Sequence, residues 1–554
     1  MSTPQIIKHL RSRLAGSNLT RRALPVVVVA AFSILGVYFL TSSHAAAPYA
    51  SINADSGTPA NGATAKACSG ANASDGNCVV FGGSTSSGKT WYLSTTGSDS
   101  NACTQSAPCL SFNRAYDVAS PGDTVQVAAG VYGGQTINWD ASKAGTSSVP
   151  NVVFEPAPGV ATIYVSGGIT VLSSHVTFEN MTLGDPNASG NAGQSDPTLW
   201  TNKSDVNADT YVLGTDPSSF NDVGFITFQN IIGRNFEVSG AHDVSVLGGS
   251  YGPSSCDGSS QPSLTQYGGG NNALRDAYPT YPSAGPHVDP YNIVIDGVTV
   301  HNIMSYNLVD CHTEGVAIFA GSAPPAGNTS PGGVTVRNSK FYGNDVYDIL
   351  AQSNSGAASL GQVTLENDWF AATTNGGGSG SAPDPGVELD SISGNVTIYN
   401  NSFNYPLLFQ DPATTGSATS PTISVSNVSI IGNIIQGPTY YLTAKGITNP
   451  LGSMCGQSGV TAQYNLTQSA SGQSCTTSTN ASVSSTASLF VNPSTDASLN
   501  FNLKSGSQAI NFVPTSVDPV TNDIDYHCRP APGQTNIDAG ASELNATGSC
   551  GNPI

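Results

Sequence analysis

One set of acidic and imidazole side chains could carry acid–base chemistry. It lies just before the apolar sequence VAIF, in the later sequence YDIL and in the sequence VELDS. Its members are Asp310, His312, Glu314, Asp348, Glu388 and Asp390. In a β-strand, residues two apart point to the same side at about 6.5 Å, and neighbouring strands lie about 4.8 Å apart. If these segments stack as strands in register, we expect the last four residues to form an acidic groove on one exposed face.

Such a groove would suit three kinds of chemistry. Two carboxylates about 6.5–9.5 Å apart support inverting glycoside hydrolysis, in which one acid is protonated and the other activates water. Glu314, Glu388 and Asp390 could instead hold Ca²⁺, which binds oxygen ligands. A lyase also needs a base that removes the proton next to a carboxylate. The candidates for that base are Arg337 and Lys340, with Arg275, Arg234, His312 and His287 as alternatives.

Some of these residues could have a structural role and no catalytic one. Arg337 and Lys340 alternate within VRNSK, which also suits a solvated strand face. His312, beside Asp310 and Cys311, could equally form a local hydrogen bond. Glu388 and Asp390 are harder to explain as solubilising charge, because the surrounding chain uses Ser, Thr and Gly for that purpose.

A long insertion between Gly249 and Asn292 is rich in tyrosine among Gly, Pro and Ser. Aromatic rings with a polar hydroxyl suit stacking on sugars, although a stiff ordered loop would use the same composition. The predicted substrate-binding residues are Tyr267, Tyr278, Tyr281 and Tyr291.

A short phrase recurs along the chain and indicates the fold that positions these residues. It consists of a β-branched residue, Thr or Ser, an apolar residue, any residue, and then Asn or Gly. The phrase begins at Val176, Val244, Val334, Val363, Val396 and Val428, with looser copies at Ile226 and Ile293. The last four copies are 29, 33 and 32 residues apart. A coil that cannot bury its own apolar row must stack on its neighbours, and Asn or Gly tolerates the left-handed backbone of a corner.

Two longer strings resemble a known superfamily. The segment from Trp91 to Gly134 is similar to the N-terminal cap and first coil of right-handed parallel β-helix proteins in the pectate-lyase-like superfamily, of exported bacterial type. Phe112, Ala115, Tyr116 and Ala119 share one face of its helical part. The segment from Asp523 to Leu544 resembles the closing phrase of such proteins, where Asp525, Arg529 and Asp538 are expected to be structural. The resemblance implies an all-β, right-handed parallel β-helix with a short N-terminal helical cap over residues 91–545.

The resemblance does not extend to catalytic motifs. The Asn-Thr-Asp, Asp-Asp, Gly-His-Gly and Arg-Ile-Lys motifs of polygalacturonase-type hydrolases are absent, as is the Arg-x-Pro-x-x-Arg motif of the best-known pectate lyases. No catalytic residue is therefore carried over from those families.

The first part of the chain predicts export. Residues 1–22 contain five basic residues and no acid, and residues 23–41 are uncharged and apolar. This pattern predicts a basic cytoplasmic segment followed by a transmembrane anchor or signal peptide. Residues 42–83 resemble the opening strands of carbohydrate-binding β-sandwich modules, although a small β unit or stalk fits their length better. Residues 84–90 read as a linker and residues 546–554 as a tail.

Cysteine usage agrees with export, because all ten cysteines follow the apolar segment and none shows zinc-type spacing. An even count in an extracellular context indicates disulfides. Proximity along the chain suggests the pairs Cys68–Cys78, Cys103–Cys109, Cys256–Cys311, Cys455–Cys475 and Cys528–Cys550. The pair between Cys256 and Cys311 would hold the tyrosine-rich insertion over one wall of the stack.

Charge restricts the class of partner. Charged residues make up only 10% of the chain, against about 25% in an average soluble domain. Beyond residue 22 there are 36 acidic and 12 basic residues, a net charge of −24. Such a surface repels nucleic acid. We predict an exported protein that binds or acts on extracellular polysaccharide as a glycoside hydrolase or polysaccharide lyase, with Ca²⁺ as the one cofactor considered. The alternative is a non-catalytic adhesion protein that uses the stack as a rigid scaffold.

Overall fold

The computed structural model describes part of the chain, and all structural statements concern that part. The described residues are 64–67, 77–80, 88–184, 210–213, 223–233, 236–239, 241–252, 254–257, 274–277, 291–306, 314–320, 333–344, 347–353, 362–371, 386–390, 395–405, 407–410, 427–436, 440–442, 448–450, 460–468 and 479–550. The chain divides into one unit over residues 1–84 and a second over residues 85–554. In the first unit, β1 (Thr64–Ala67) pairs antiparallel with β2 (Asn77–Val80).

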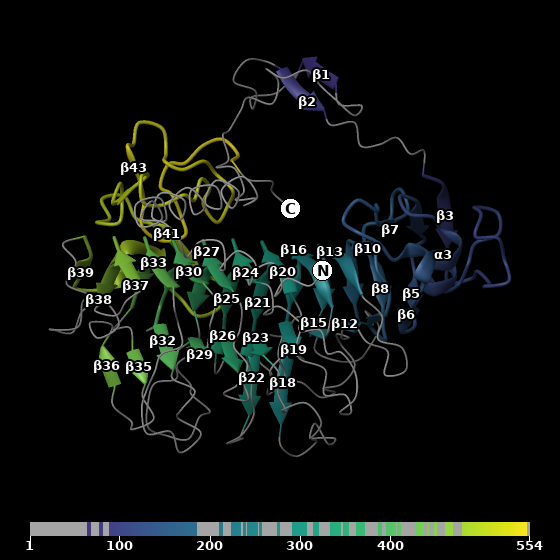
Figure 1. Cartoon of the computed structure of the whole chain (residues 1–554), viewed down its shortest axis with the longest axis horizontal. Helices are drawn as coiled ribbons and strands as arrows, with labels where there is room; N and C mark the ends of the chain where they lie inside the picture. Colours follow the sequence, from purple (N-terminus) through teal and green to yellow (C-terminus); the bar gives the residue numbers. More distant parts are fainter. Residues whose placement is uncertain are drawn as a thin grey trace, which may run out of the picture. The chain divides into compact units, whose positions relative to one another are not determined.

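The second unit consists of three long β-sheets whose strands follow one another in turn along the chain (Figure 1). The first sheet contains, in order, β3 (Thr90–Leu93), β4 (Thr124–Val127), β7 (Val152–Pro156), β10 (Val176–Glu179), β13 (Gly224–Gln229), β16 (His242–Leu247), β20 (Tyr291–Asp296), β24 (Val334–Arg337), β27 (Val363–Glu366), β30 (Asn395–Tyr399), β33 (Asn427–Ile431) and β37 (Val460–Gln463). The second contains β5 (Val131–Tyr132), β8 (Ile163–Val165), β11 (Met181–Leu183), β14 (Ile232–Gly233), β17 (Ser250–Tyr251), β21 (Thr299–His301), β25 (Lys340–Tyr342), β28 (Trp369–Ala371), β31 (Ser402–Phe403), β34 (Ile434–Ile435), β38 (Leu466–Gln468) and β39 (Ala481–Val483).

The third sheet contains β6 (Gln135–Ile137), β9 (Ile169–Val171), β12 (Thr210–Leu213), β15 (Phe236–Ser239), β19 (Leu274–Ala277), β23 (Glu314–Ala320), β26 (Tyr347–Ser353), β29 (Val387–Asp390), β32 (Leu407–Gln410), β35 (Tyr440–Leu442) and β36 (Thr448–Pro450). Within the three sheets only β36 pairs antiparallel, with β35. A short side sheet joins β18 (Ser254–Asp257) to β22 (Ile303–Tyr306). Each turn of the chain thus adds one strand to each sheet, so the predicted parallel β-helix is confirmed.

The last residue of the recurring phrase forms the corner between the first and second sheets. Asn180, Asn338, Asn367 and Asn400 have φ between 52° and 58°, and Gly432 has φ of 72°. One position further on, buried asparagines form a ladder, in which the Nδ2 of Asn401, Asn433 and Asn465 donates to the Oδ1 of the next coil's asparagine at 3.1, 2.9 and 3.2 Å. The left-handed corner expected from the sequence is therefore present, and the asparagine ladder lies one position beyond it.

Aromatic rings stack along the interior of the helix. The ring centroids of Phe112 and Phe154, Phe154 and Phe178, and Phe178 and Phe228 lie 5.1, 5.3 and 5.2 Å apart. Each of these side chains is fully buried. Strands such as β13 and β16 alternate buried and more exposed residues, so their apolar half faces this shared core.

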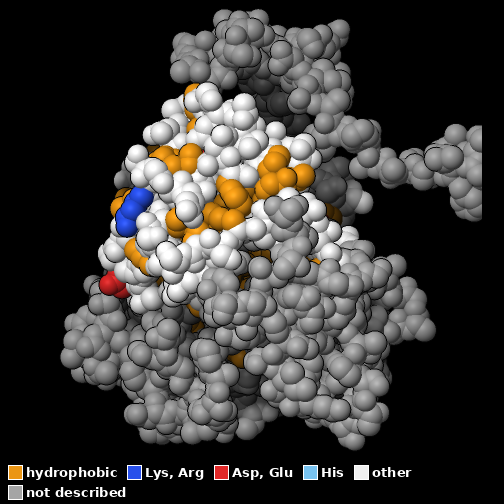
Figure 2. Space-filling view, turned by 90° about the vertical axis from the view of Figure 1, so that its left-hand side faces the viewer, with side chains coloured by type: hydrophobic (Ala, Val, Ile, Leu, Met, Phe, Trp, Pro, Cys, Tyr) orange, Lys and Arg blue, Asp and Glu red, His pale blue; other side chains and the backbone are white. Residues whose placement is uncertain are grey.

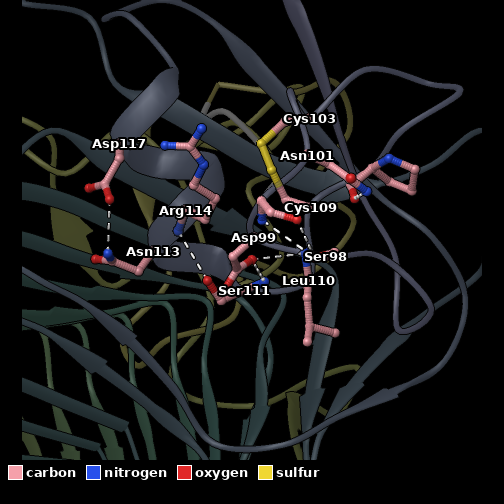
Figure 3. Close-up of a disulfide and its surroundings, with 12 residues drawn as sticks. Ser98, Asp99, Asn101, Cys103, Cys109, Leu110, Ser111, Asn113, Arg114 and Asp117 are labelled. Atoms are coloured by element: carbon pink, nitrogen blue, oxygen red, sulfur yellow. Dashed lines mark hydrogen bonds between the residues drawn. A yellow bond between two sulfur atoms is a disulfide. The ribbon is translucent and has the colours of Figure 1, made fainter.

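A helix and a disulfide loop close the N-terminal end of the stack. Helix α3 (Phe112–Val118) is capped by Ser111, whose side chain accepts a hydrogen bond from the Arg114 amide. Its apolar face is buried, as the sequence predicted. The Cys103–Cys109 disulfide shapes the preceding loop (Figure 3). That loop pairs with the outer edge of β3, because the Tyr92 amide donates to the Cys103 carbonyl and the Cys109 amide donates to the Tyr92 carbonyl, at 2.9 and 3.0 Å.

The C-terminal segment, residues 484–550, packs in a separate apolar cluster on the outer side of the second sheet and lies along the corner between the first two sheets. It begins with the 3-10 helix η7 (Thr486–Leu489) and the pair β40 (Phe490–Asn492) and β41 (Asn500–Leu503), and later forms β42 (Val513–Pro514) and β43 (Asn536–Ile537). The amides of Gly540 and Ala541 donate to the Gly432 carbonyl and the Ser402 hydroxyl of the stack. The Cys528–Cys550 disulfide closes this segment.

Two of the five predicted disulfides are thus confirmed, and they indicate an oxidising compartment. Among the remaining six cysteines, Cys78 lies in β2 and Cys256 in β18, and their bonding stays a prediction. The other four lie outside the described residues, namely Cys68, Cys311, Cys455 and Cys475. In the described ranges no helix has the length and apolarity to span a membrane, and residues 23–41 lie outside them.

Candidate functional site

Three adjacent strands of the third sheet carry most of the predicted acidic residues. Glu314 begins β23, Asp348 is the second residue of β26, and Glu388 and Asp390 lie in β29. The register pairs Glu314 with Tyr347, and Glu388 with Leu350 and Leu408. The structure thus brings these acids onto neighbouring strands, but offset from one another by one or more positions along the strands.

Glu388 and Asp390 hold equivalent positions in β29. They alternate with Val387 and Leu389, which are buried in the core. Successive residues of a strand alternate between the two faces of a sheet. Glu388 and Asp390 therefore hold the positions of the outer face.

Asp348 does not lie on an exposed face, so this part of the sequence prediction is wrong. Its side chain is fully buried. Its carboxylate accepts hydrogen bonds from the hydroxyl of Tyr405 at 2.5 Å and the Nδ2 of Asn344 at 2.7 Å. The physical reason is the sheet corner, where Asn344 follows β25 in the same coil and Tyr405 follows β31 in a later coil, so these two polar groups enclose the carboxylate.

Two glycines allow the close packing around Asp348 and Tyr405. A β-carbon at Gly386 would lie 1.9 Å from the Tyr405 ring, and one at Gly315 would lie 2.6 Å from the Asp348 carbonyl oxygen. Burial raises the pKa of Asp348 to about 7, although the hydrogen bonds from Tyr405 and Asn344 oppose that rise. Asp348 therefore exchanges a proton near neutral pH, but from a position that a substrate does not reach.

Arg337 and Lys340 are not brought to the acids of the third sheet. They lie in β24 and β25, on either side of the corner between the first and second sheets. The Nε of Arg337 lies 2.7 Å from Asp296, and the Nζ of Lys340 lies 3.5 Å from Asp525 of the C-terminal segment. Lys340 also lies over the Trp369 ring, 4.5 Å from its centroid. The expectation of a base beside the acidic groove is wrong for both, because the returning C-terminal segment and Asp296 pair with them.

Several predicted site residues lie outside the described part of the chain: Asp310, His312, Tyr267, Tyr278 and Tyr281. Tyr291 begins β20, where the register pairs it with His242. No group of three or more His, Cys, Asp or Glu among the described side chains could hold a metal. The calcium role of Glu314, Glu388 and Asp390 therefore stays a prediction.

Sequence reasoning missed an aromatic pair on the second sheet. The rings of His301 in β21 and Tyr342 in β25 stack at 5.3 Å. The His301 Nε2 lies 3.1 Å from the Ser250 hydroxyl, and burial lowers the pKa of His301 to about 4. The imidazole is thus neutral at physiological pH. The only available signal was that both residues follow a copy of the phrase by the same number of positions.

The surface of the stack is poor in charge. On the end formed by the last coils, Figure 2 shows mostly uncharged polar groups with scattered hydrophobic side chains. On the first sheet, Thr335, Thr364, Thr397, Ser429 and Thr461 are register partners in successive strands. The first four are the second residues of the recurring phrase, and all five lie between core-facing positions, so a row of hydroxyl groups runs along this face.

No protein-family profile and no curated protein matches the chain. Solved structures do. Pectate lyase Pel9A is 15% identical with a TM-score of 0.29, over 82% of this chain and 96% of its own. A rhamnogalacturonan lyase is 14% identical with a TM-score of 0.27, over 68% of this chain and 87% of its own. The GH136 lacto-N-biosidase from Eubacterium ramulus is 12% identical with a TM-score of 0.27, over 59% and 64%. These distant neighbours are polysaccharide lyases and a glycoside hydrolase by name, and the fold of the present chain is established by its own strand pairing.

Proposed function

We propose that this protein is an exported β-helix protein that binds extracellular polysaccharide and hydrolyses it at the third sheet. The observation that carries the proposal is the placement of Glu388 and Asp390 in β29, at the positions that alternate with buried Val387 and Leu389. Two such positions lie about 6.5 Å apart along the strand, a spacing that is compatible with the carboxyl separation that inverting glycosidases use.

We favour hydrolysis because the carboxyls of Glu388 and Asp390 suffice for it, whereas a lyase needs a base near the acids. Arg337 and Lys340 are both paired elsewhere. Arg275 lies in β19, the strand next to β23 in the third sheet, so elimination with this residue as the base is the alternative. In a hydrolase one carboxyl donates a proton to the leaving oxygen while the other activates water. We assign those roles to Glu388 and Asp390 as a pair. Asp348 acts as a positioning residue, because its buried hydrogen bonds fix the start of β26 beside β29.

The charge of the chain narrows the class of glycan. With −24 beyond residue 22, long-range attraction to a polyanionic glycan is absent. An uncharged polysaccharide meets no such repulsion, and its hydroxyl groups suit a surface rich in Ser, Thr and Asn. We therefore propose a neutral extracellular polysaccharide as the ligand.

The test is a glycan screen of the full-length protein, with release of reducing ends as the readout for hydrolysis and ultraviolet absorbance of unsaturated products as the readout for elimination. We expect reducing ends from a neutral glycan, and a loss of about 10²-fold or more in rate for Glu388→Gln or Asp390→Asn. Glu155→Gln, an acid on the first sheet, is the matched control and should keep full activity. Binding without any product would overturn the hydrolase and favour the adhesion alternative.

A further inference from the structure

An acid occupies one position of the asparagine ladder. In each coil the amide of the ladder residue donates to the side chain of the ladder residue in the next coil. The Ser339 amide donates to the Oδ1 of Asp368 at 2.8 Å, and the Asp368 amide donates to the Oδ1 of Asn401 at 2.9 Å. The same bond continues to the end of the ladder, through Asn433, Asn465 and Asn480. Asp368 is thus a full member of the ladder, with a carboxyl where the later coils have an amide.

The asparagines show what the second polar atom of a ladder side chain does. The Nδ2 of each asparagine donates to a backbone carbonyl in the strand of the previous coil. Leu365 is the acceptor for Asn401, and it pairs in register with Val336 of the coil before. The equivalent acceptor for Asp368 is therefore the Val336 carbonyl. The observed donor and acceptor pairs are Asn401 with Leu365, Asn433 with Ile398, and Asn465 with Ile430, at 3.0, 2.8 and 2.8 Å.

A carboxylate cannot take over the role of the amide at this position. An ionised carboxyl only accepts hydrogen bonds, so its second oxygen would face a carbonyl oxygen with no proton between them. Asp368 is fully buried, and a buried charge without a counter-charge is costly. A protonated carboxyl has one O–H donor and can make the bond that Nδ2 makes in an asparagine. The ladder therefore requires a neutral Asp368.

The charged groups around Asp368 also favour the neutral form. Burial raises its pKa well above the ordinary value, and the charges of Glu366 and of Asp296 in β20 add to that rise, although backbone hydrogen bonds from Ser339 and Glu366 oppose it. Arg337 of β24 is ion-paired with Asp296 and also acts on Glu366. Further ionisable groups at this corner are Tyr405 after β31, Lys340 of β25, and Asp518, Asp523, Asp525, Tyr526, His527 and Arg529 of the C-terminal segment.

The corner that the ladder supports also holds the C-terminal segment. The Nδ2 of Asn367 donates to the Asn522 carbonyl at 2.9 Å. The Asp368 carbonyl accepts from the Ser402 amide at 2.9 Å, and the Ser402 hydroxyl accepts from the Ala541 amide at 3.1 Å. A change in the position of the Asp368 backbone therefore reaches two attachments of the C-terminal segment.

We propose that Asp368 is a proton-dependent latch, whose neutral carboxyl closes the ladder between Ser339 and Asn401 and whose ionisation loosens the C-terminal segment. On ionisation the O–H bond of the carboxyl breaks, the proton passes to water, and the Val336 carbonyl loses its donor. The latch is separate from the third sheet and does not depend on the proposed hydrolase.

Infrared spectroscopy of the full-length protein tests the protonation state directly, because a protonated carboxyl and a carboxylate absorb at well-separated frequencies. At about pH 6, we expect the spectrum of the wild type minus that of Asp368→Asn to show the band of one protonated carboxyl. Asp348 is a second buried acid and contributes equally to both spectra. Asp496→Asn is the matched control, because Asp496 is exposed and hydrogen bonds from Ser498 lower its pKa; it should remove only a carboxylate band.

Amide hydrogen exchange of residues 515–545 tests the link to the C-terminal segment. The rates of the wild type and of Asp368→Asn are compared at each pH between about 5 and 9, so that the intrinsic pH dependence of exchange cancels. Opening of the latch releases a proton in the wild type alone, so its exchange relative to the variant should accelerate by up to about tenfold per pH unit. Because the pKa is raised in the folded state, the protection is present at low pH and is lost as the pH rises through that pKa.

Two more variants keep the test decisive. Asp368→Ser should behave like Asp368→Asn, because serine already serves in the ladder at Ser339, where the hydroxyl donates to the Arg337 carbonyl and accepts from the Val298 amide. Asn401→Asp places a second acid in the ladder and should add a second pH-dependent step of the same sign.

A carboxylate band for Asp368 in the difference spectrum would overturn the proposal. So would a ratio of exchange rates between the wild type and both Asp368 variants that stays constant with pH, because the proton would then have no effect on the C-terminal segment. Since neither readout involves a glycan, failure here leaves the hydrolase proposal standing, and the converse also holds.

Discussion

Asp348 should make the stability of the protein depend on pH. Its folded-state pKa is about 7, against an ordinary value of 3.8. The folded protein therefore holds a proton that the unfolded chain has released between those two values. At about 1.4 kcal/mol per pH unit, this contributes about 4 kcal/mol of stability. The contribution is fully present below pH 3.8, and it is lost as the pH rises to about 7.

The measurement compares chemical unfolding of the wild type and Asp348→Asn at a series of pH values between about 4 and 8. Asparagine keeps the shape of the side chain and cannot ionise. The stability of the wild type relative to the variant should fall by about 4 kcal/mol across that range, with most of the change below about pH 7. Other buried acids titrate in both proteins, so their effects cancel in the difference.

A second variant separates the carboxyl from its surroundings. Tyr405→Phe removes the 2.5 Å hydrogen bond to the Asp348 carboxylate and leaves the ionisable group. Without that donor the charged form is less favoured, so the pH dependence should persist and extend to higher pH. A wild type and an Asp348→Asn variant whose stabilities run parallel between pH 4 and 8 would refute the assignment of a buried, protonated carboxyl.

Two further predictions concern the stack itself. Asn433→Ala removes the acceptor of the Asn401 amide and side chain and should destabilise the protein by about 1–3 kcal/mol for each group left unpaired, while Thr461→Ala, on the exposed face, should change the unfolding free energy by less than about 0.5 kcal/mol. Phe178→Ala removes a ring stacked on both sides and should cost about 3–5 kcal/mol in the same unfolding assay; a cost below about 1 kcal/mol would contradict the continuous aromatic core.

The fold could be predicted from the sequence because its determinants are local. Asn338, Asn367 and Asn400 occupy the last position of the recurring phrase, and each has the left-handed backbone that this position requires. The strand and its corner residue recur from coil to coil, so a motif of five residues is enough to predict a strand and the corner that follows it. The helical cap and the short Cys103–Cys109 loop are likewise encoded within a few residues.

The candidate site was less predictable because its contacts are long-range. Asp348 is enclosed by Tyr405, which is 57 residues away in the sequence. The distance between two copies of the recurring phrase does not reveal which residue near a corner points inward. Lys340 pairs with Asp525 of the C-terminal segment, so its role depends on the path of a segment that shares no repeat with the stack. The acids of β29 alternate with buried Val387 and Leu389, and their role in a site stays a prediction.

The loop closed by Cys103 and Cys109 has a consequence for solubility. A strand inside a sheet is hydrogen-bonded on both edges. The first strand of a sheet has one edge of unpaired amide and carbonyl groups, with which a strand of another chain can pair. Here the loop occupies that margin of β3 through the amides of Tyr92 and Cys109. This small covalent ring thus covers the outer edge of the first sheet, so the edge of β3 is not free to pair with a strand of another molecule.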